Sequence, residues 1–88
     1  MREAAVSSRI AKRVRRIVAV QVGCERRAIS LTDRIDELGL GNIDRLEIVL
    51  DCQRRFGVRV DGEFAWVTVA DIIAAVRHGL DYQELEAA

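Results

Sequence analysis

Proline is absent from this chain of 88 residues, histidine occurs once, cysteine occurs twice, and aromatic residues make up 5% of the sequence. No apolar run approaches the roughly 20 residues that cross a bilayer, and the start lacks the continuous apolar segment of a signal peptide. The chain is 50% apolar and 32% charged, which is the composition of a globular domain. We therefore expect a cytoplasmic protein with no membrane contact.

The scarcity of histidine and cysteine also restricts the chemistry of the chain. Cys24 and Cys52 are far apart and have no histidine at metal-ligand spacing, so we expect neither a disulfide nor a metal site. The single histidine, His78, stands near the expected end of a helix, where a cation is stabilised by the helix dipole. The sequence holds no Ser-His-Asp set, Cys-His pair or glycine-rich phosphate loop, so we expect no catalytic residues and no enzyme activity.

Apolar residues recur at three- and four-residue spacing in three segments. This period predicts main helices over residues 6–22, 42–57 and about 68–79. The long connection between the first two helices carries spaced apolar residues and is expected to pack across the bundle. The fold class that follows is all-α, a small four-helix bundle with three main helices, one short helix and a long first loop. A single domain spans residues 1–88, with a core of about 7–79 and an acidic tail over 80–88.

Local sequence signals predict how the last helix of the chain begins and ends. Thr68 and Asp71 have the spacing of a capping box at the start of the last helix, and Gly79 is expected to end that helix. A short turn or helix before it is expected to bring Phe64 and Trp66 into the core.

The zero net charge of the chain hides an asymmetry. Residues 1–27 hold eight Lys and Arg residues against two acids, and residues 28–88 hold six against twelve. Five cations share the solvent-facing arc of the first helix: Arg9, Lys12, Arg13, Arg15 and Arg16. The face is either a solvated one, partly neutralised by acids elsewhere in the fold, or a binding face for nucleic acid, acidic lipid or an acidic protein.

The second helix has a broad apolar arc, which predicts that it contacts several neighbours and is the central helix of the bundle. Its apolar residues are Ile43, Leu46, Ile48, Val49, Leu50, Cys52 and Phe56. Its other side carries Asp44, Glu47, Asp51, Arg54 and Arg55, so this surface is acidic at the N-terminal end and basic at the C-terminal end.

The start of this helix is the most specific motif. The run Leu38-Gly39-Leu40-Gly41-Asn42-Ile43 is followed by Asp44, Leu46, Glu47 and Ile48, and Asn42 is expected to cap the helix. From these residues the chain resembles the acyl carrier protein family over roughly residues 7–79. In that family a Leu-Gly-x-Asp-Ser-Leu-type signature opens the second helix, and its serine carries a 4'-phosphopantetheine arm.

The resemblance implies that this chain keeps the spacing of that signature but lacks its reactive serine. Asn42 stands where the family has the modified serine, and Gly41 stands where it usually has aspartate; Gly39, Ile43 and Asp44 are the motif's neighbours. A carboxamide is no substitute for a hydroxyl nucleophile, so no 4'-phosphopantetheine cofactor is expected at Asn42. In the family the exposed side of the second helix docks on partner enzymes. The equivalent face here is Asp44, Glu47, Asp51, Arg54 and Arg55.

Three functions remain open from the sequence. The first is a carrier-like domain without its arm that acts through contacts with acyl- or aminoacyl-handling enzymes of a fatty-acid, polyketide or related pathway. The second is a true carrier whose cargo is held non-covalently or attached elsewhere, for instance at Cys24. The third is a small helical binder of anions such as nucleic acid, which the neutral total charge disfavours. The protein is expected to be a monomer.

Overall fold

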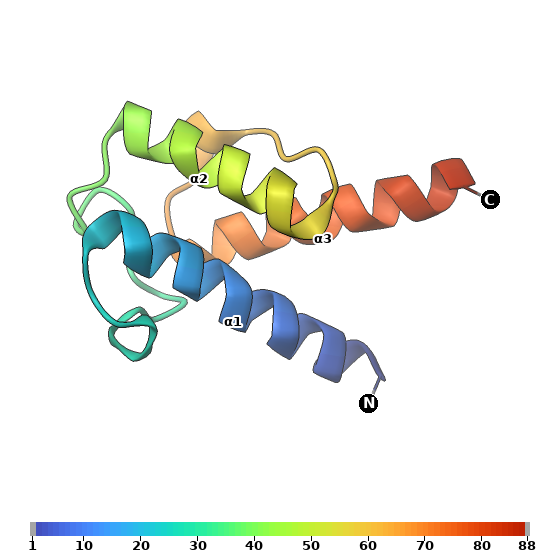
Figure 1. Ribbon diagram of the computed structural model, residues 1–88, viewed down its shortest axis with the longest axis horizontal. Helices are drawn as coiled ribbons and strands as arrows, with labels where there is room; N and C mark the ends of the chain where they lie inside the picture. The colour runs from blue at the N-terminus through green and yellow to red at the C-terminus, as the bar shows by residue number, and fades with distance from the viewer. Residues whose placement is uncertain (1, 88) are drawn as a thin grey trace.

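The computed structural model describes the backbone of residues 2–87 and the side chains of residues 8–86 (Figure 1). Three α-helices follow one another: α1 spans Arg2–Val22, α2 spans Asn42–Phe56 and α3 spans Val69–Ala87. Two short 3₁₀ helices stand between them, η1 over Arg26–Ala28 and η2 over Glu63–Ala65. No strand occurs in the described chain. The predicted all-α bundle of three main helices and a short one is confirmed, and η1 is an additional turn that the sequence did not predict.

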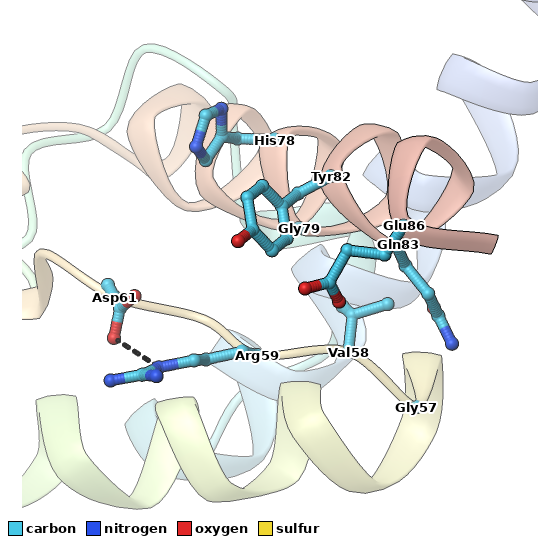
Figure 2. Close-up of a pocket in the computed structure, with 9 residues that line it drawn as sticks. All are labelled: Gly57, Val58, Arg59, Asp61, His78, Gly79, Tyr82, Gln83 and Glu86. Carbon is cyan, nitrogen blue, oxygen red and sulfur yellow. Dashed lines mark hydrogen bonds and ion pairs between the residues drawn. The ribbon is translucent and has the colours of Figure 1, made fainter. Parts of the chain in front are cut away.

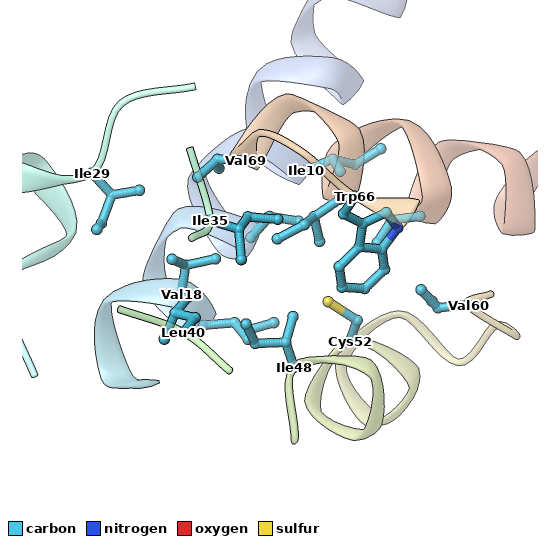
Figure 3. Packing of buried hydrophobic residues seen from close by; sticks show 14 of the residues in the cluster. Ile10, Val18, Ile29, Ile35, Leu40, Ile48, Cys52, Val60, Trp66 and Val69 are labelled. Carbon is cyan, nitrogen blue, oxygen red and sulfur yellow. The ribbon is translucent and has the colours of Figure 1, made fainter. Parts of the chain in front are cut away.

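Helix α1 packs against both α2 and α3, and α2 also contacts η2 (Figure 1). The buried residues come from all three α-helices and from the connections between them. They include Ile10 and Val18 of α1, Ile48 and Cys52 of α2, and Val69 of α3 (Figure 3). No charged or polar side chain is buried among them in the described part of the chain. The three helices therefore enclose one continuous apolar core.

The long first loop packs across the bundle, as its apolar residues predicted. Ile29, Ile35 and Leu40 are buried, although Leu31 is 39% exposed. The loop also completes the start of α3, because the amide of Val69 donates to the carbonyl of Asp33 and the amide of Ala70 donates to that of Leu31. Amides at a helix N-terminus have no partner within the helix, so the loop and α3 depend on each other.

The capping box predicted at the start of α3 forms through one of its two residues, Asp71. The Asp71 carboxylate accepts the amides of Thr68, at 3.0 Å, and of Val67, at 2.8 Å. These two bonds, from Thr68 first and then Val67, hold the pKa of Asp71 below its usual value. The capping box therefore works here through its acidic residue.

Gly79 does not end α3, so that prediction is wrong. The helix continues to Ala87, and the segment expected to be an acidic tail over 80–88 is helical through residue 87. Gly79 is buried inside the helix, where a Cβ would stand 2.5 Å from the carbonyl oxygen of Arg59. A glycine at this position lets the backbone of α3 approach the 58–59 segment. His78 is consequently exposed in mid-helix and caps nothing.

Of the two aromatic side chains expected in the core, one is buried and the other is exposed. Trp66 is buried beside Cys52 (Figure 3), whereas Phe64 is 62% exposed on η2. Arg45 fixes this segment, since its Nη1 donates to the carbonyls of Glu63 and Trp66, each at 2.7 Å. A cation that bonds two carbonyls of a neighbouring segment joins η2 to α2.

Candidate functional site

Helix α2 begins at Asn42, as the sequence predicted, but Asn42 is not its cap. Gly41 takes the N-cap position in an extended conformation, and its amide donates to Oδ2 of Asp44 at 2.9 Å. Asn42 is therefore the first residue of the helix, and its side chain is exposed. The preceding turn is held by buried Leu40 and by Gly39, whose φ of +80° favours glycine.

The apolar residues of α2 form two separate arcs and not one broad one. At about 100° per residue, Ile48, Cys52 and Phe56 fall together on the core side, and Cys52 is fully buried. Burial raises the pKa of the Cys52 thiol to about 12. Val49 is partly buried against the same core. The remaining three apolar residues face solvent: Ile43 at 76% exposed, Leu46 at 43% and Leu50 at 44%. We call these three the apolar stripe of α2.

The five charged residues predicted as a docking face lie beside this stripe. Glu47, Arg54 and Arg55 are exposed, while Asp44 and Asp51 are partly buried. Asp51 pairs with Arg54 at 3.1 Å, so part of the surface is neutralised within the helix. These charged residues border the stripe along one side, and apolar side chains next to charged ones are common in protein–protein interfaces.

No group at the start of α2 has the chemistry of a phosphopantetheine acceptor. Residue 42 carries a carboxamide, and Gly41 before it has no side chain. The hydroxyls of Ser30 and Thr32 lie in the long loop and hydrogen-bond to each other at 3.1 Å. The residues present at this position therefore do not fit covalent attachment of the arm.

A cleft of about 630 Å³ lies at the opposite end of α2. It is formed between the 57–61 segment and the C-terminal half of α3, with Arg59, Asp61, Tyr82 and Glu86 among its lining residues. Figure 2 shows the Tyr82 side chain projecting from α3 toward the 57–61 segment, where Arg59 pairs with Asp61 at 3.4 Å. Because α2 has 15 residues, the cleft stands about 22 Å along the helix from Asn42. It is not part of the site at Asn42.

Comparison with known proteins identifies the family of this chain. The profile of the family described as "Phosphopantetheine attachment site" matches residues 12–76, which is most of the chain. The chain belongs to the acyl carrier protein family. It is 30% identical over 67 residues to the acyl carrier proteins of Lactococcus lactis subsp. cremoris (strain MG1363) and subsp. lactis (strain IL1403). Each of these matches covers 76% of this chain and 92% of the relative.

The match covers the whole segment from the middle of α1 to the middle of α3, so it includes the carrier-family signature at the start of α2. Within the described residues, no helix is both long enough and apolar enough to cross a membrane. The same residues contain no group of three or more His, Cys, Asp or Glu side chains placed to hold a metal ion.

Sequence reasoning missed two features of this site. The apolar stripe was assigned to the core, because composition alone cannot tell which part of a wide apolar arc meets a neighbour. The role of Arg45 was also missed, although a signal was available. At about 100° per residue, Arg45 falls between Cys52 and Phe56, in the middle of the buried arc, where a cation needs specific acceptors.

Proposed function

We propose that this carrier-family domain is not loaded with 4'-phosphopantetheine at residue 42 and acts through contacts with acyl- or aminoacyl-handling enzymes. The observation that carries the proposal is the exposed carboxamide of Asn42 at the first position of α2, where the family signature has its serine. The partner enzymes would belong to a fatty-acid, polyketide or related pathway. The domain would have no catalytic residues of its own.

The apolar stripe of α2 supports a role in protein contacts. Ile43, Leu46 and Leu50 follow one another at intervals of three and four residues, so they form one continuous line on the helix surface. Exposed apolar side chains that gather on one face of a small domain mark interaction sites. Glu47 and Arg54 border this line along one side and would fix the orientation of the partner through charge.

The experiment that tests this role is capture of partners from the native host, followed by their identification by mass spectrometry. We expect the wild-type chain to retain an acyl- or aminoacyl-handling enzyme and the variant Leu46→Glu with Leu50→Glu to lose it. The matched control is Leu31→Glu with Leu85→Glu, which adds the same two charges at exposed leucines of the first loop and of α3. Partner binding that survives in the α2 variant would contradict the proposed docking face.

A second experiment separates this proposal from a loaded carrier. The intact mass of the protein from its native host should equal the mass of the sequence. A mass increment that disappears after Cys24→Ser would assign the arm to that exposed thiol. A ligand that is lost on denaturation would indicate non-covalent cargo.

A further inference from the structure

Four cations share the exposed side of α1, which runs along one edge of the bundle (Figure 1). Arg9, Lys12, Arg13 and Arg16 are exposed, and at about 100° per residue they fall within an arc of about 100° that lies away from the core side of the helix. We call these four residues the basic stripe. Between residues 8 and 22 the one other residue in this arc is Val20, which is 70% exposed. The surface is therefore cationic throughout, with no aromatic side chain and one aliphatic side chain.

The basic stripe forms no ion pair with an acid among the described side chains. The ion pairs of these side chains join Arg27 to Glu25, Arg34 to Asp36 and Glu37, Arg54 to Asp51, and Arg59 to Asp61. The sequence left open that acids of the fold partly neutralise this face. No such neutralisation by direct pairing occurs in the part of the chain that the structure describes, so the four charges stay available to a partner.

Further cations lie next to the stripe along the chain. Residues 8–27 hold seven Lys and Arg residues against one acid, Glu25. Arg15, expected on the exposed face, is instead partly buried, and its Nε has no hydrogen-bond partner among the described residues. Arg26 belongs to η1, which contacts α1, and is also partly buried. Positive charge therefore extends from α1 into the start of the first loop.

The composition of the stripe disfavours two of the anionic partners that the sequence left open. The core of a protein–protein interface is apolar and poor in charged residues, whereas this arc holds four cations and one aliphatic residue. A helix that lies on an acidic membrane places large apolar side chains in the lipid beside its cations. Val20 is the one apolar residue of this arc between residues 8 and 22, so neither an acidic protein nor a membrane fits it well.

The phosphate backbone of a duplex nucleic acid matches the stripe in charge and in length. Seven residues separate Arg9 from Arg16, which gives a line of about 10 Å at 1.5 Å per residue. A duplex carries one negative charge per about 1.7 Å of its axis, so the same length presents about six phosphates. Three of the four cations are arginines, whose planar guanidinium binds phosphate through two parallel hydrogen bonds. A single strand fits less well, because the arc has no aromatic side chain on which bases could stack.

We infer that the basic stripe of α1 binds the phosphate backbone of duplex nucleic acid. Contacts with phosphates carry no sequence information, so the binding has no sequence preference. The zero net charge of the chain disfavours this partner at the level of the sequence, but charges more than about 10 Å apart are largely screened at 0.1 M salt. The local charge of α1 therefore governs the contact. This function uses a different helix from the docking face proposed on α2.

Fluorescence anisotropy of a labelled DNA duplex tests this inference. Each phosphate contact contributes about −0.9 to the slope of log binding constant against log salt concentration, so four contacts give a slope of about −3.6. We therefore expect the affinity to fall about 100-fold between about 50 and 200 mM salt. Arg13→Gln should reduce the size of the slope by about 0.9. Arg13→Glu with Arg16→Glu should abolish binding, because it reverses half of the stripe.

The matched control is Arg34→Glu with Arg59→Glu, which changes the net charge equally at exposed arginines that pair with acids elsewhere. It should bind the duplex, and circular dichroism should show that every variant keeps its helices. Poly-glutamate and phosphatidylserine vesicles serve as the competing anions, and both should bind more weakly than the duplex. Tighter binding of either probe would overturn the inference, as would duplex binding that is indifferent to salt or unchanged in Arg13→Glu with Arg16→Glu.

The result is separate from the search for partner enzymes. Leu46→Glu with Leu50→Glu should lose the partner enzyme of the proposed function. It should bind the duplex as well as Leu31→Glu with Leu85→Glu does, since both double variants add the same charge outside α1. A loss of duplex binding in the α2 variant alone would place the nucleic acid on α2 and overturn the assignment to the basic stripe.

Discussion

The α3 backbone at Gly79 lies against the carbonyl oxygen of Arg59, so that a Cβ at residue 79 would stand 2.5 Å from that oxygen. The side chain of Val58, which is itself buried, lies 3.1 Å from the same position. This contact joins the C-terminal half of α3 to the extended segment that follows α2.

Gly79→Ala should therefore destabilise the fold, although alanine is the better residue inside an exposed helix by about 1 kcal/mol. Backbone must move to admit the methyl group, and we expect a net loss of about 1–3 kcal/mol in the free energy of unfolding, measured with urea. The control is Ala74→Gly at an exposed position of α3, where alanine should be favoured as usual. A Gly79→Ala protein that is more stable than the wild type would contradict the close approach.

Arg45→Met should remove the connection between α2 and η2. Both carbonyls that accept from Nη1 would lose a charge-assisted bond, and we expect a loss of about 1–3 kcal/mol in the free energy of unfolding. Fluorescence of Trp66, the one tryptophan of the chain, should shift toward that of an exposed indole before global unfolding. Arg55→Met, at an exposed position of the same helix, should change stability by less than about 0.5 kcal/mol. Equal effects of the two substitutions would exclude a specific role for Arg45.

Asp71→Ala should give a pH-dependent loss of stability. The pKa of Asp71 is lowered in the folded state, so the carboxylate stabilises the fold above its unfolded pKa, near 4, and this stability is lost as pH falls through the folded-state pKa. We expect the variant to be about 1 kcal/mol less stable than the wild type at pH 7. Urea unfolding should show that difference shrinking toward zero at about pH 2. Glu84→Ala, at an exposed site of α3, serves as the control, and a difference for Asp71→Ala that is independent of pH would contradict this account.

The two thiols should differ strongly in their reaction with alkylating reagents. Cys24 is exposed, whereas Cys52 is buried with a pKa of about 12, so it holds almost no thiolate at neutral pH. Mass spectrometry of the native protein at pH 8 should show one rapid addition, at Cys24, and a second only after unfolding. Two additions at similar rates would mean that the core around Cys52 opens readily.

The helices could be predicted from the sequence because apolar periodicity is a local property. The start of α2 was predicted at the correct residue, although Gly41 and not Asn42 is its cap. Features that depend on contacts between distant segments could not be predicted from the sequence. Gly79 has the local character of a helix stop, and only the position of the Arg59 backbone explains why the helix continues through it. The seven apolar residues of α2 look alike in sequence, but the bundle covers only some of them. The position of Asn42 was predictable because the family signature is a contiguous motif.

The measurement that tests the central claim most directly is the intact mass of this chain after incubation with coenzyme A and a broad-specificity pantetheinyl transferase. We expect the wild-type mass to remain unchanged, because residue 42 offers a carboxamide and no hydroxyl. The variant Gly41→Asp with Asn42→Ser, which restores the family signature at an exposed position, should gain one pantetheine-sized increment. A pantetheine-sized increment on the wild-type chain would contradict the account, since another residue would then accept the arm.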